Sequence, residues 1–342
     1  MVACRGSTSP VERPFGSFFG ISGYVIGYGF LHNRYALTGE GLRHFYVNRF
    51  LRIYPLFLLL SLIGWLTIWL ATRTSPIGWA DVPGQLLALQ FNHGYVLNGV
   101  FWTLGLEIQF YLIAPILVLP LLIKDVSKRW WIVAVCYFLM LAFISYAVRK
   151  LGWSPDGRNI VATLPHFFTG MVGCSLVASM KPNIRLAWGY LGGAVVLLLL
   201  TNWFYHRDPE VFLSFRGIFL VDTMIMLFIL SHANLEEERA GISFLIRGLS
   251  WIGTLSYGIY AWHAYLLTQA AWLSGHAVLL LVASVTVAYL SYRLIELPAL
   301  KLKKWQSSKR YPGNHFPCLP AGNLTLQPLV EINTNAGPKC KK

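Results

Sequence analysis

The chain has 342 residues, of which 56% are apolar and 12% are charged. A soluble domain carries about 25% charged residues, so this composition excludes an ordinary soluble protein and indicates a polytopic membrane protein. The formal net charge of +14 does not indicate a nucleic-acid partner, because the basic residues are distributed as the orientation of a membrane protein requires.

Apolar runs of roughly 18 to 25 residues are long enough to cross a bilayer as helices. Transmembrane strands would instead alternate apolar and polar residues in shorter segments. The sequence therefore predicts an all-α, polytopic integral membrane bundle with about nine transmembrane helices. They are expected near residues 15–32, 53–71, 104–123, 130–148, 160–178, 186–205, 214–232, 248–272 and 276–296.

The distribution of Lys and Arg predicts the orientation of these helices. If the 32–52 loop faces the cytoplasm, alternating loops place most basic residues on the cytoplasmic side, as the positive-inside rule expects. We predict a multi-pass protein of the cytoplasmic (inner) membrane, in contact with membrane lipid, with an external N-terminus and a cytoplasmic C-terminus. Residues 1–14 are predicted to be a polar segment, 15–300 a membrane domain, and 301–342 a basic, disordered tail.

The first polar motif is VNRFLRIYP, residues 47–55, where the second run begins. Arg49 and Arg52 are three residues apart and share one face of a helix. Two adjacent guanidinium groups can bind phosphate oxygens in bidentate fashion. The same pair could alternatively anchor the helix among lipid headgroups.

The second motif, WTLGLEIQFY, spans residues 102–111. A carboxylate inside an apolar segment is costly unless it is paired or hydrated, so Glu107 marks a functional site by default. Glu107 and Tyr111 stand at i and i+4 and can share a hydrogen bond. Trp102 at the outer interface places Glu107 within two turns of the external face. A buried structural pair is the alternative interpretation.

Two later runs carry further signals. Gly170 and Gly173 are three residues apart and permit close helix packing. In LSYGIYAWH, residues 255–263, Ser256, Tyr260 and His263 fall on one helix face and predict a polar stripe toward the bundle interior. His263 is a candidate general base or acceptor-binding group, although a lone histidine can equally be a satisfied structural residue.

The last run ends in RLIELP, residues 293–298. Arg293 and Glu296 can pair within one turn, and Glu296 is expected at the same depth as Arg49 and Arg52, where it could hold one of them. The favoured interpretation of Glu296 is ion pairing within the fold. The five cysteines and the acidic and histidine residues have no metal-ligand spacing, so no metal is expected.

Together these motifs resemble membrane acyltransferase family 3, the O-antigen and exopolysaccharide acetyltransferase-like integral membrane enzymes. RFLRIYP, WTLGLEIQFYLIAP, LPHFFTGMVG, LSYGIYAWH and IELP occur in the family's order. The segment 18–26, FFGISGYVI, resembles its FF-x-x-SGF-x-I signature. The resemblance covers roughly residues 15–300.

The resemblance implies transfer of an acyl group, usually acetyl, from cytoplasmic acyl-CoA as co-substrate to a hydroxyl of a cell-envelope sugar. The expected acceptor is an exopolysaccharide, a lipopolysaccharide or a lipid-linked glycan, and no bound cofactor is implied. By this resemblance Arg49 and Arg52 would bind donor phosphates and Glu107 would belong to the core site. His263 and Glu296 would complete the polar interior.

The start of the sequence departs from the family pattern. Family members begin with an additional span that carries an Arg about ten residues before a His, and this His is thought to be the catalytic base. Here MVACRGSTSPVERP precedes Phe15, so we expect that span to be absent. Two alternatives therefore stay open beside the acyltransferase: a truncated inactive homologue, and a lipid-linked glycan transporter or flippase.

Overall fold

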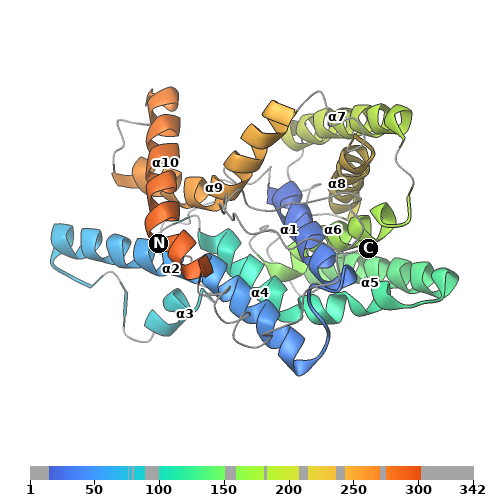
Figure 1. Ribbon diagram of the computed structural model, residues 1–342, viewed down its shortest axis with the longest axis horizontal. Helices are drawn as coiled ribbons and strands as arrows, with labels where there is room; N and C mark the ends of the chain where they lie inside the picture. The colour runs from blue at the N-terminus through green and yellow to red at the C-terminus, as the bar shows by residue number, and fades with distance from the viewer. Residues whose placement is uncertain are drawn as a thin grey trace, which may run out of the picture.

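The computed structural model describes residues 15–75, 77–78, 81–88, 99, 101–150, 159–180, 183–207, 215–235, 243–269 and 275–301. Within these residues every regular element is helical (Figure 1). The elements are α1 (Phe15–Leu31), α2 (Gly39–Thr72), α3 (Val82–Leu86), α4 (Phe101–Leu117), η2 (Leu119–Leu122), α5 (Val126–Lys150), α6 (Ile160–Val177), α7 (Ile184–Arg207), α8 (Phe215–Leu235), α9 (Ser243–Gln269), α10 (Ala277–Ser291) and η6 (Tyr292–Glu296). The predicted N-terminal segment and nearly all of the predicted tail, 1–14 and 302–342, lie outside the described residues.

Each of the nine predicted runs coincides with a helix, which confirms the all-α class. The number of membrane spans is a different matter. Six helices in the described part of the chain are long and apolar enough to cross a membrane. Two others contain shorter apolar stretches, Gly16–Leu31 in α1 and Gly217–His232 in α8. The count of nine is therefore not confirmed, because α1, α8 and α9 are not among these six helices.

Local sequence explains several helix ends. Thr38 Oγ1 accepts a hydrogen bond from Gly41 N at 3.2 Å, and this N-cap begins α2. Asn159 Oδ1 accepts from Val161 N at 2.8 Å and caps α6 in the same way. Pro120 has no backbone N–H and cannot continue α4, so the chain tightens there into the 3₁₀ turn η2.

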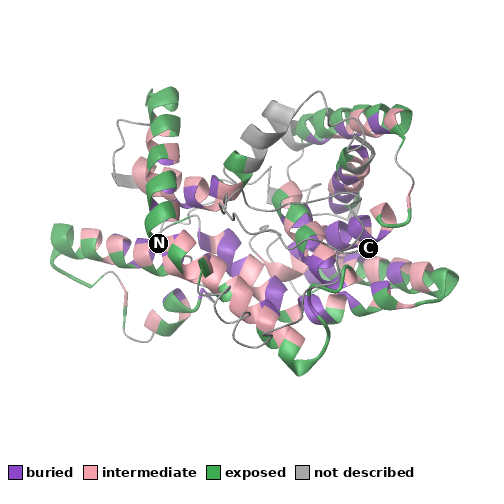
Figure 2. Ribbon diagram, in the orientation of Figure 1, coloured by how far each residue is buried: buried purple, intermediate pink, exposed green. Residues whose placement is uncertain are grey.

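The core lies where α1, α2, α4 and α6 meet, and Figure 2 shows buried residues concentrated on these helices. It is rich in aromatic rings. Phe110 of α4 stacks on Phe167 of α6 with ring centroids 4.0 Å apart, and Phe19 of α1 lies 4.8 Å from the same ring. Offset and tilted aromatic pairs of this kind are favourable beyond the area they bury. This core holds together the four helices that carry Ser22, Arg49, Glu107 and His166.

Glycines bring α1 and α6 into backbone contact. A Cβ atom on Gly170 would overlap the backbone of Gly20, and one on Gly23 would overlap the carbonyl of Phe167. The predicted close packing at Gly170 is thus confirmed. Gly173 faces a different partner, since its Cβ position lies 3.1 Å from Ile229 of α8. Small residues let membrane helices approach in this way, and here they fix α1 against α6.

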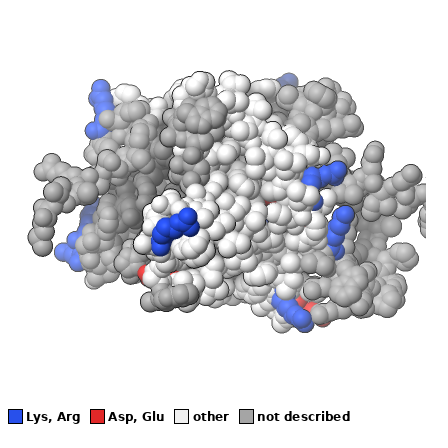
Figure 3. Space-filling view, turned by 90° about the vertical axis from the view of Figure 1, so that its left-hand side faces the viewer, with Lys and Arg blue, Asp and Glu red and all other residues white. Residues whose placement is uncertain are grey.

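The outer surface of the described bundle is apolar. Large side chains such as Leu62 of α2, Leu199 of α7 and Val278 of α10 are 61%, 63% and 76% exposed. On the face shown in Figure 3 the described residues are almost all uncharged, and the few Lys and Arg are set apart from one another. Apolar helices with apolar exposed faces are what contact with lipid tails requires, in agreement with the predicted membrane protein.

Candidate functional site

The centre of the site is Glu107 on α4, which accepts two hydrogen bonds. Tyr111, one turn later, donates its hydroxyl to Glu107 Oε1 at 2.5 Å, which confirms the predicted i, i+4 pair. Ser22 of α1 donates to the same Oε1 atom at 3.0 Å. Both bonds go to one oxygen, and no bond from a described residue is recorded at Oε2. That second oxygen is therefore available to a ligand hydroxyl.

Arg49 of α2 extends this network. Its Cζ atom lies 5.5 Å from the ring centroid of Tyr111 and 5.8 Å from that of Phe45. Its Nε atom is buried and has no hydrogen-bond partner among the described residues. A buried donor without a partner costs about 1–3 kcal/mol, a cost that an anionic ligand would remove. Arg49, Tyr111, Glu107 and Ser22 thus form one continuous polar chain across three helices.

The Arg52 side chain points toward α9, whereas that of Arg49 lies against Tyr111 and Phe45. Its Nη2 atom donates to the backbone carbonyl of Thr254 at 3.4 Å. One turn along α9, the hydroxyl of Tyr257 donates to the carbonyl of Ile53 at 3.0 Å. These two bonds tie α2 to α9 at the level of the basic motif, so the two predicted arginines belong to adjacent but different contacts.

Glu296 ends η6 and is 1% exposed. No ion pair within 4.0 Å joins Glu296 to a described residue, and its Oε2 atom is buried without a hydrogen-bond partner there. The predicted ion-pairing role is therefore not realised as a direct contact.

The predicted Arg293–Glu296 pair is wrong. Residues 292–296 form a π-helical turn, which is wider than an α turn, so residues three apart no longer share a face. Glu296 consequently points inward, whereas Arg293 is exposed and its Cζ atom lies 5.8 Å from the ring of Tyr289. Single π turns are frequent at functional sites.

The predicted stripe on α9 is only partly realised. The Tyr260 hydroxyl hydrogen-bonds Thr103 Oγ1 of α4 at 2.8 Å, and the rings of Tyr260 and His263 lie 5.6 Å apart. The Nδ1 atom of His263 is 3.3 Å from the carbonyl of Ile259 on its own helix. Ser256 does not join them: its side chain is exposed and its hydroxyl donates to Gly253 O at 2.8 Å. The expectation that all three face the interior is wrong at Ser256, because its hydroxyl is satisfied by its own helix.

Trp102, which was predicted to lie at the outer membrane interface, is half-buried and packs against the core. It lies on α4, the helix that also carries Glu107. It borders the polar chain through its neighbour Thr103, which is 1% exposed and bonded to Tyr260. Of the residues predicted for the site, the structure gathers Arg49, Tyr111 and Glu107 in one network, with Tyr260 and His263 on the adjoining helix.

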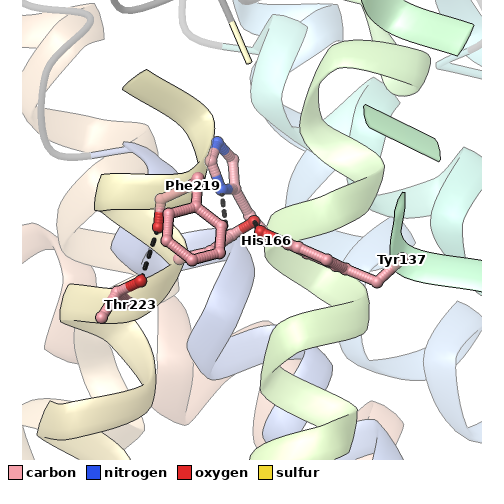
Figure 4. Close-up of polar contacts among 5 residues, drawn as sticks. Tyr137, His166, Phe219 and Thr223 are labelled. Carbon is pink, nitrogen blue, oxygen red and sulfur yellow. Dashed lines mark hydrogen bonds and ion pairs between the residues drawn. The ribbon is translucent and has the colours of Figure 1, made fainter. Parts of the chain in front are cut away.

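A second polar cluster was missed by sequence reasoning. His166 Nδ1 of α6 lies 2.6 Å from Asp222 Oδ1 of α8, and the Tyr137 hydroxyl of α5 donates to Asp222 Oδ2 at 2.7 Å (Figure 4). The sequence does contain a signal for it, because Asp222 is a lone carboxylate in the apolar 214–232 run, as Glu107 is in its own run. The other missed residue, Ser22, lies within the FFGISGYVI signature but had no visible partner in the sequence.

Among the described side chains, no group of three or more His, Cys, Asp or Glu lies close enough together to hold a metal ion. What the main network offers is a carboxylate oriented by two hydroxyls and flanked by a guanidinium. Such an arrangement can bind a sugar hydroxyl through the free carboxylate oxygen. It can bind an anionic group through the arginine.

Comparison with known proteins gives a consistent result. A family model described as an acyltransferase domain matches residues 17–293. The peptidoglycan O-acetyltransferase of Listeria monocytogenes is 24% identical over 328 residues, covering 83% of this chain and 50% of that protein. A provisionally named O-acetyltransferase of Staphylococcus aureus is 25% identical over 330 residues, covering 85% of this chain and 54% of that protein.

A third relative is a provisionally named peptidoglycan O-acetyltransferase of Bacillus subtilis, 27% identical over 218 residues, covering 58% of this chain and 34% of that protein. The chain spans about half the length of the first two relatives. No solved structure matches it.

Proposed function

This chain belongs to the acyltransferase family whose model it matches over residues 17–293, and on that premise we propose that it is a membrane O-acyltransferase. It transfers an acyl group, acetyl in the first instance, from cytoplasmic acyl-CoA to a hydroxyl of a cell-envelope glycan. The protein acts in the cytoplasmic membrane. The names of the relatives extend the acceptors to be tested from exopolysaccharide and lipopolysaccharide to peptidoglycan.

The observation that carries this proposal is the continuous chain from Arg49 through Tyr111 to Glu107 and Ser22. A donor phosphate bound at Arg49 would satisfy its buried Nε atom. An acceptor hydroxyl bound at Glu107 Oε2 would lie one tyrosine away. Donor and acceptor groups can therefore be held at the same time, and holding both in place lowers the barrier to transfer.

Mutation of the two ends of this chain tests the proposal. The full chain is reconstituted in lipid vesicles with radiolabelled acetyl-CoA and, in separate reactions, peptidoglycan strands, exopolysaccharide or lipopolysaccharide. Arg49→Gln should raise the KM for acetyl-CoA about tenfold or more, because a hydrogen bond to a charged group contributes about 1.5–3 kcal/mol. Glu107→Gln should lower kcat by about 100-fold or more, as loss of an acid–base group does.

Two exposed residues of α2, the helix that carries Arg49, provide the controls. Arg43→Gln matches the arginine change and Glu40→Gln matches the carboxylate change, and both should keep wild-type kinetics. Absence of acetyl transfer by the wild type to every acceptor would contradict the proposal. Glycan movement across the vesicle membrane that survives Arg49→Gln and Arg52→Gln would instead support a transporter.

A further inference from the structure

Glu296 and Arg52 form a second polar contact beside the Glu107 network, against one turn of α9. Glu296 is 1% exposed, and its Oε2 atom is buried without a hydrogen-bond partner among the described residues. The π turn at residues 292–296 directs the side chain inward. A buried oxygen in this condition costs free energy until a group donates to it. Glu296 therefore offers a carboxylate oxygen to the N–H or O–H group of a ligand.

The backbone of α9 shows how near Arg52 is to Glu296. Arg52 Nη2 lies 3.4 Å from the carbonyl oxygen of Thr254. Glu296 Oε1 lies 3.5 Å from the Cβ position of Gly258. Thr254 and Gly258 are four residues apart and share one face of α9, a single turn of about 5.4 Å. No ion pair within 4.0 Å joins Arg52 to Glu296. The two charged groups thus flank one turn of α9 without touching each other.

A ligand group that binds both side chains must accept from one and donate to the other. The guanidinium of Arg52 has only donors, and the carboxylate of Glu296 has only acceptors. The bond from Arg52 to Thr254 is longer than the usual range of about 2.7–3.2 Å, so a better acceptor can replace it. A secondary amide meets both demands, because its C=O and N–H point in opposite directions. A phosphate would be attracted by Arg52 but repelled by Glu296, so the pair favours an amide.

Two helices connect this pair to Glu107. On α2, Arg52 comes one turn after Arg49, which adjoins the Glu107 network. On α9, Tyr260 hydrogen-bonds Thr103 of α4 at 2.8 Å, one turn before Glu107 on that helix. Contacts therefore run from Arg49 past the Arg52–Glu296 pair to the helix of the central carboxylate.

Acyl-CoA has an amide at the distance that this order requires. Its pantetheine arm joins the phosphates to the thioester and contains secondary amides. The carbonyl of the amide nearer to the phosphates lies roughly 6 Å from the phosphorus in an extended arm, because three such bonds span about 3.6 Å. Arg49 and Arg52 are three residues apart on a helix, which separates them by about 5–6 Å. A phosphate bound at Arg49 therefore sets this amide beside Arg52.

We propose that Arg52 and Glu296 bind the pantetheine amide nearer to the phosphates of the acyl donor. The amide carbonyl accepts from Arg52, and the amide N–H donates to Glu296. This inference rests on the function proposed above, and it moves Arg52 from the phosphates to the arm. The arm then enters the bundle in one direction, with the thioester toward α4 and Glu107. Neither side chain takes part in bond making, since both hold the donor.

An analogue of acetyl-CoA tests this contact in the same vesicle assay. In the analogue an oxygen atom replaces the nitrogen of that amide, so the N–H is lost and the carbonyl is kept. The wild type should have a kcat/KM about tenfold or more higher for acetyl-CoA than for the ester analogue, the usual effect of one hydrogen bond to a charged group. Glu296→Gln should reduce this preference to about threefold or less, because a neutral hydrogen bond is about half as strong.

The ratio of the two donors separates binding from packing. A variant that only packs badly loses both donors equally and keeps the wild-type ratio. Glu40→Gln, at an exposed carboxylate of α2, is the matched control and should keep the full preference. If Glu296→Gln does not fold, Glu296→Asp takes its place with the same expectation, because its shorter side chain withdraws the carboxylate.

Two results would overturn the inference and leave the proposed function standing. One is a wild type that transfers acetyl from both donors equally well. The other is a wild-type preference that persists undiminished in the Glu296 variant. Absence of acetyl transfer from acetyl-CoA by the wild type would overturn the proposed function itself.

Discussion

At the scale of single residues, Glu107 is a carboxylate placed within an apolar helix. A carboxylate in hydrocarbon costs at least about 2.5–3.5 kcal/mol on insertion scales. Here Tyr111 and Ser22 offset that cost by donating to Oε1. The chain thus retains a charged oxygen inside the bundle, with two hydroxyls fixing its direction.

The two donors can be tested individually. Tyr111→Phe removes the 2.5 Å bond and should reduce acetyl transfer about tenfold or more, because hydrogen bonds to charged groups contribute about 1.5–3 kcal/mol. Ser22→Ala removes the longer bond and should have a smaller effect in the same direction. Initial rates with labelled acetyl-CoA measure both. Tyr146→Phe, at a tyrosine that is 56% exposed, is the control, and equal losses in all three variants would contradict a specific role for Glu107's partners.

Sequence reasoning at this scale succeeded for local pairs and failed for distant ones. The Glu107–Tyr111 bond was predictable because both residues lie on one helix at i and i+4. Ser22 is 85 positions from Glu107, and no periodicity reveals a contact between separate helices. The Arg293–Glu296 pair was predicted wrongly for a third reason, since the π turn that separates them leaves no mark in the sequence.

At the scale of elements, the α1–α6 contact organises both polar clusters. α1 carries Ser22 to Glu107, and α6 carries His166 to Asp222. Their backbones touch at Gly20, Gly23 and Gly170. Each predicted run falls on a helix of the described residues because apolar length is a strong signal, although α2 begins at Gly39 and not near residue 53. The runs could not show which helices are neighbours, so the His166–Asp222 contact, 56 positions apart, remained hidden.

A single methyl group should therefore disturb this contact. Gly170→Ala places a Cβ atom against the backbone of Gly20, and overpacking of this kind costs about 1–3 kcal/mol. We expect a lower thermal unfolding midpoint in detergent, followed by tryptophan fluorescence, and a parallel loss of acetyl transfer. Gly192→Ala on α7 is the matched control, because nothing lies within 4 Å of its Cβ position. Equal midpoints for the two variants would show that α1 and α6 separate freely.

At the scale of the whole molecule, the distribution of basic residues predicts which end of the bundle faces the cytoplasm. This orientation bears directly on the proposed reaction. Acyl-CoA is made in the cytoplasm, so Arg49 must face that side for the proposed donor site to be filled. The N-terminal end of α1 then faces the external side.

Labelling of single cysteines tests this orientation. In a variant with all five native cysteines replaced by serine, Ser75→Cys after α2 should react with a membrane-impermeant maleimide applied to intact cells. Lys128→Cys at the start of α5 should react only after the membrane is opened. Mass-shift electrophoresis measures both reactions. The reverse pattern would place Arg49 on the external side and contradict a cytoplasmic donor.

The length of α2 has a consequence for how a substrate reaches this protein. Its 34 residues extend about 51 Å, whereas the hydrocarbon layer is about 30 Å thick. The helix is apolar from Ile53 onward, so its first turns, about four of them, stand in the headgroup layer, and Arg49 and Arg52 lie at the boundary. At this depth the phosphate groups of lipids lie close to the two guanidinium groups. If a soluble anionic donor binds at these arginines, it competes with lipid phosphates, so we expect the charge of the surrounding lipid to affect the reaction rate.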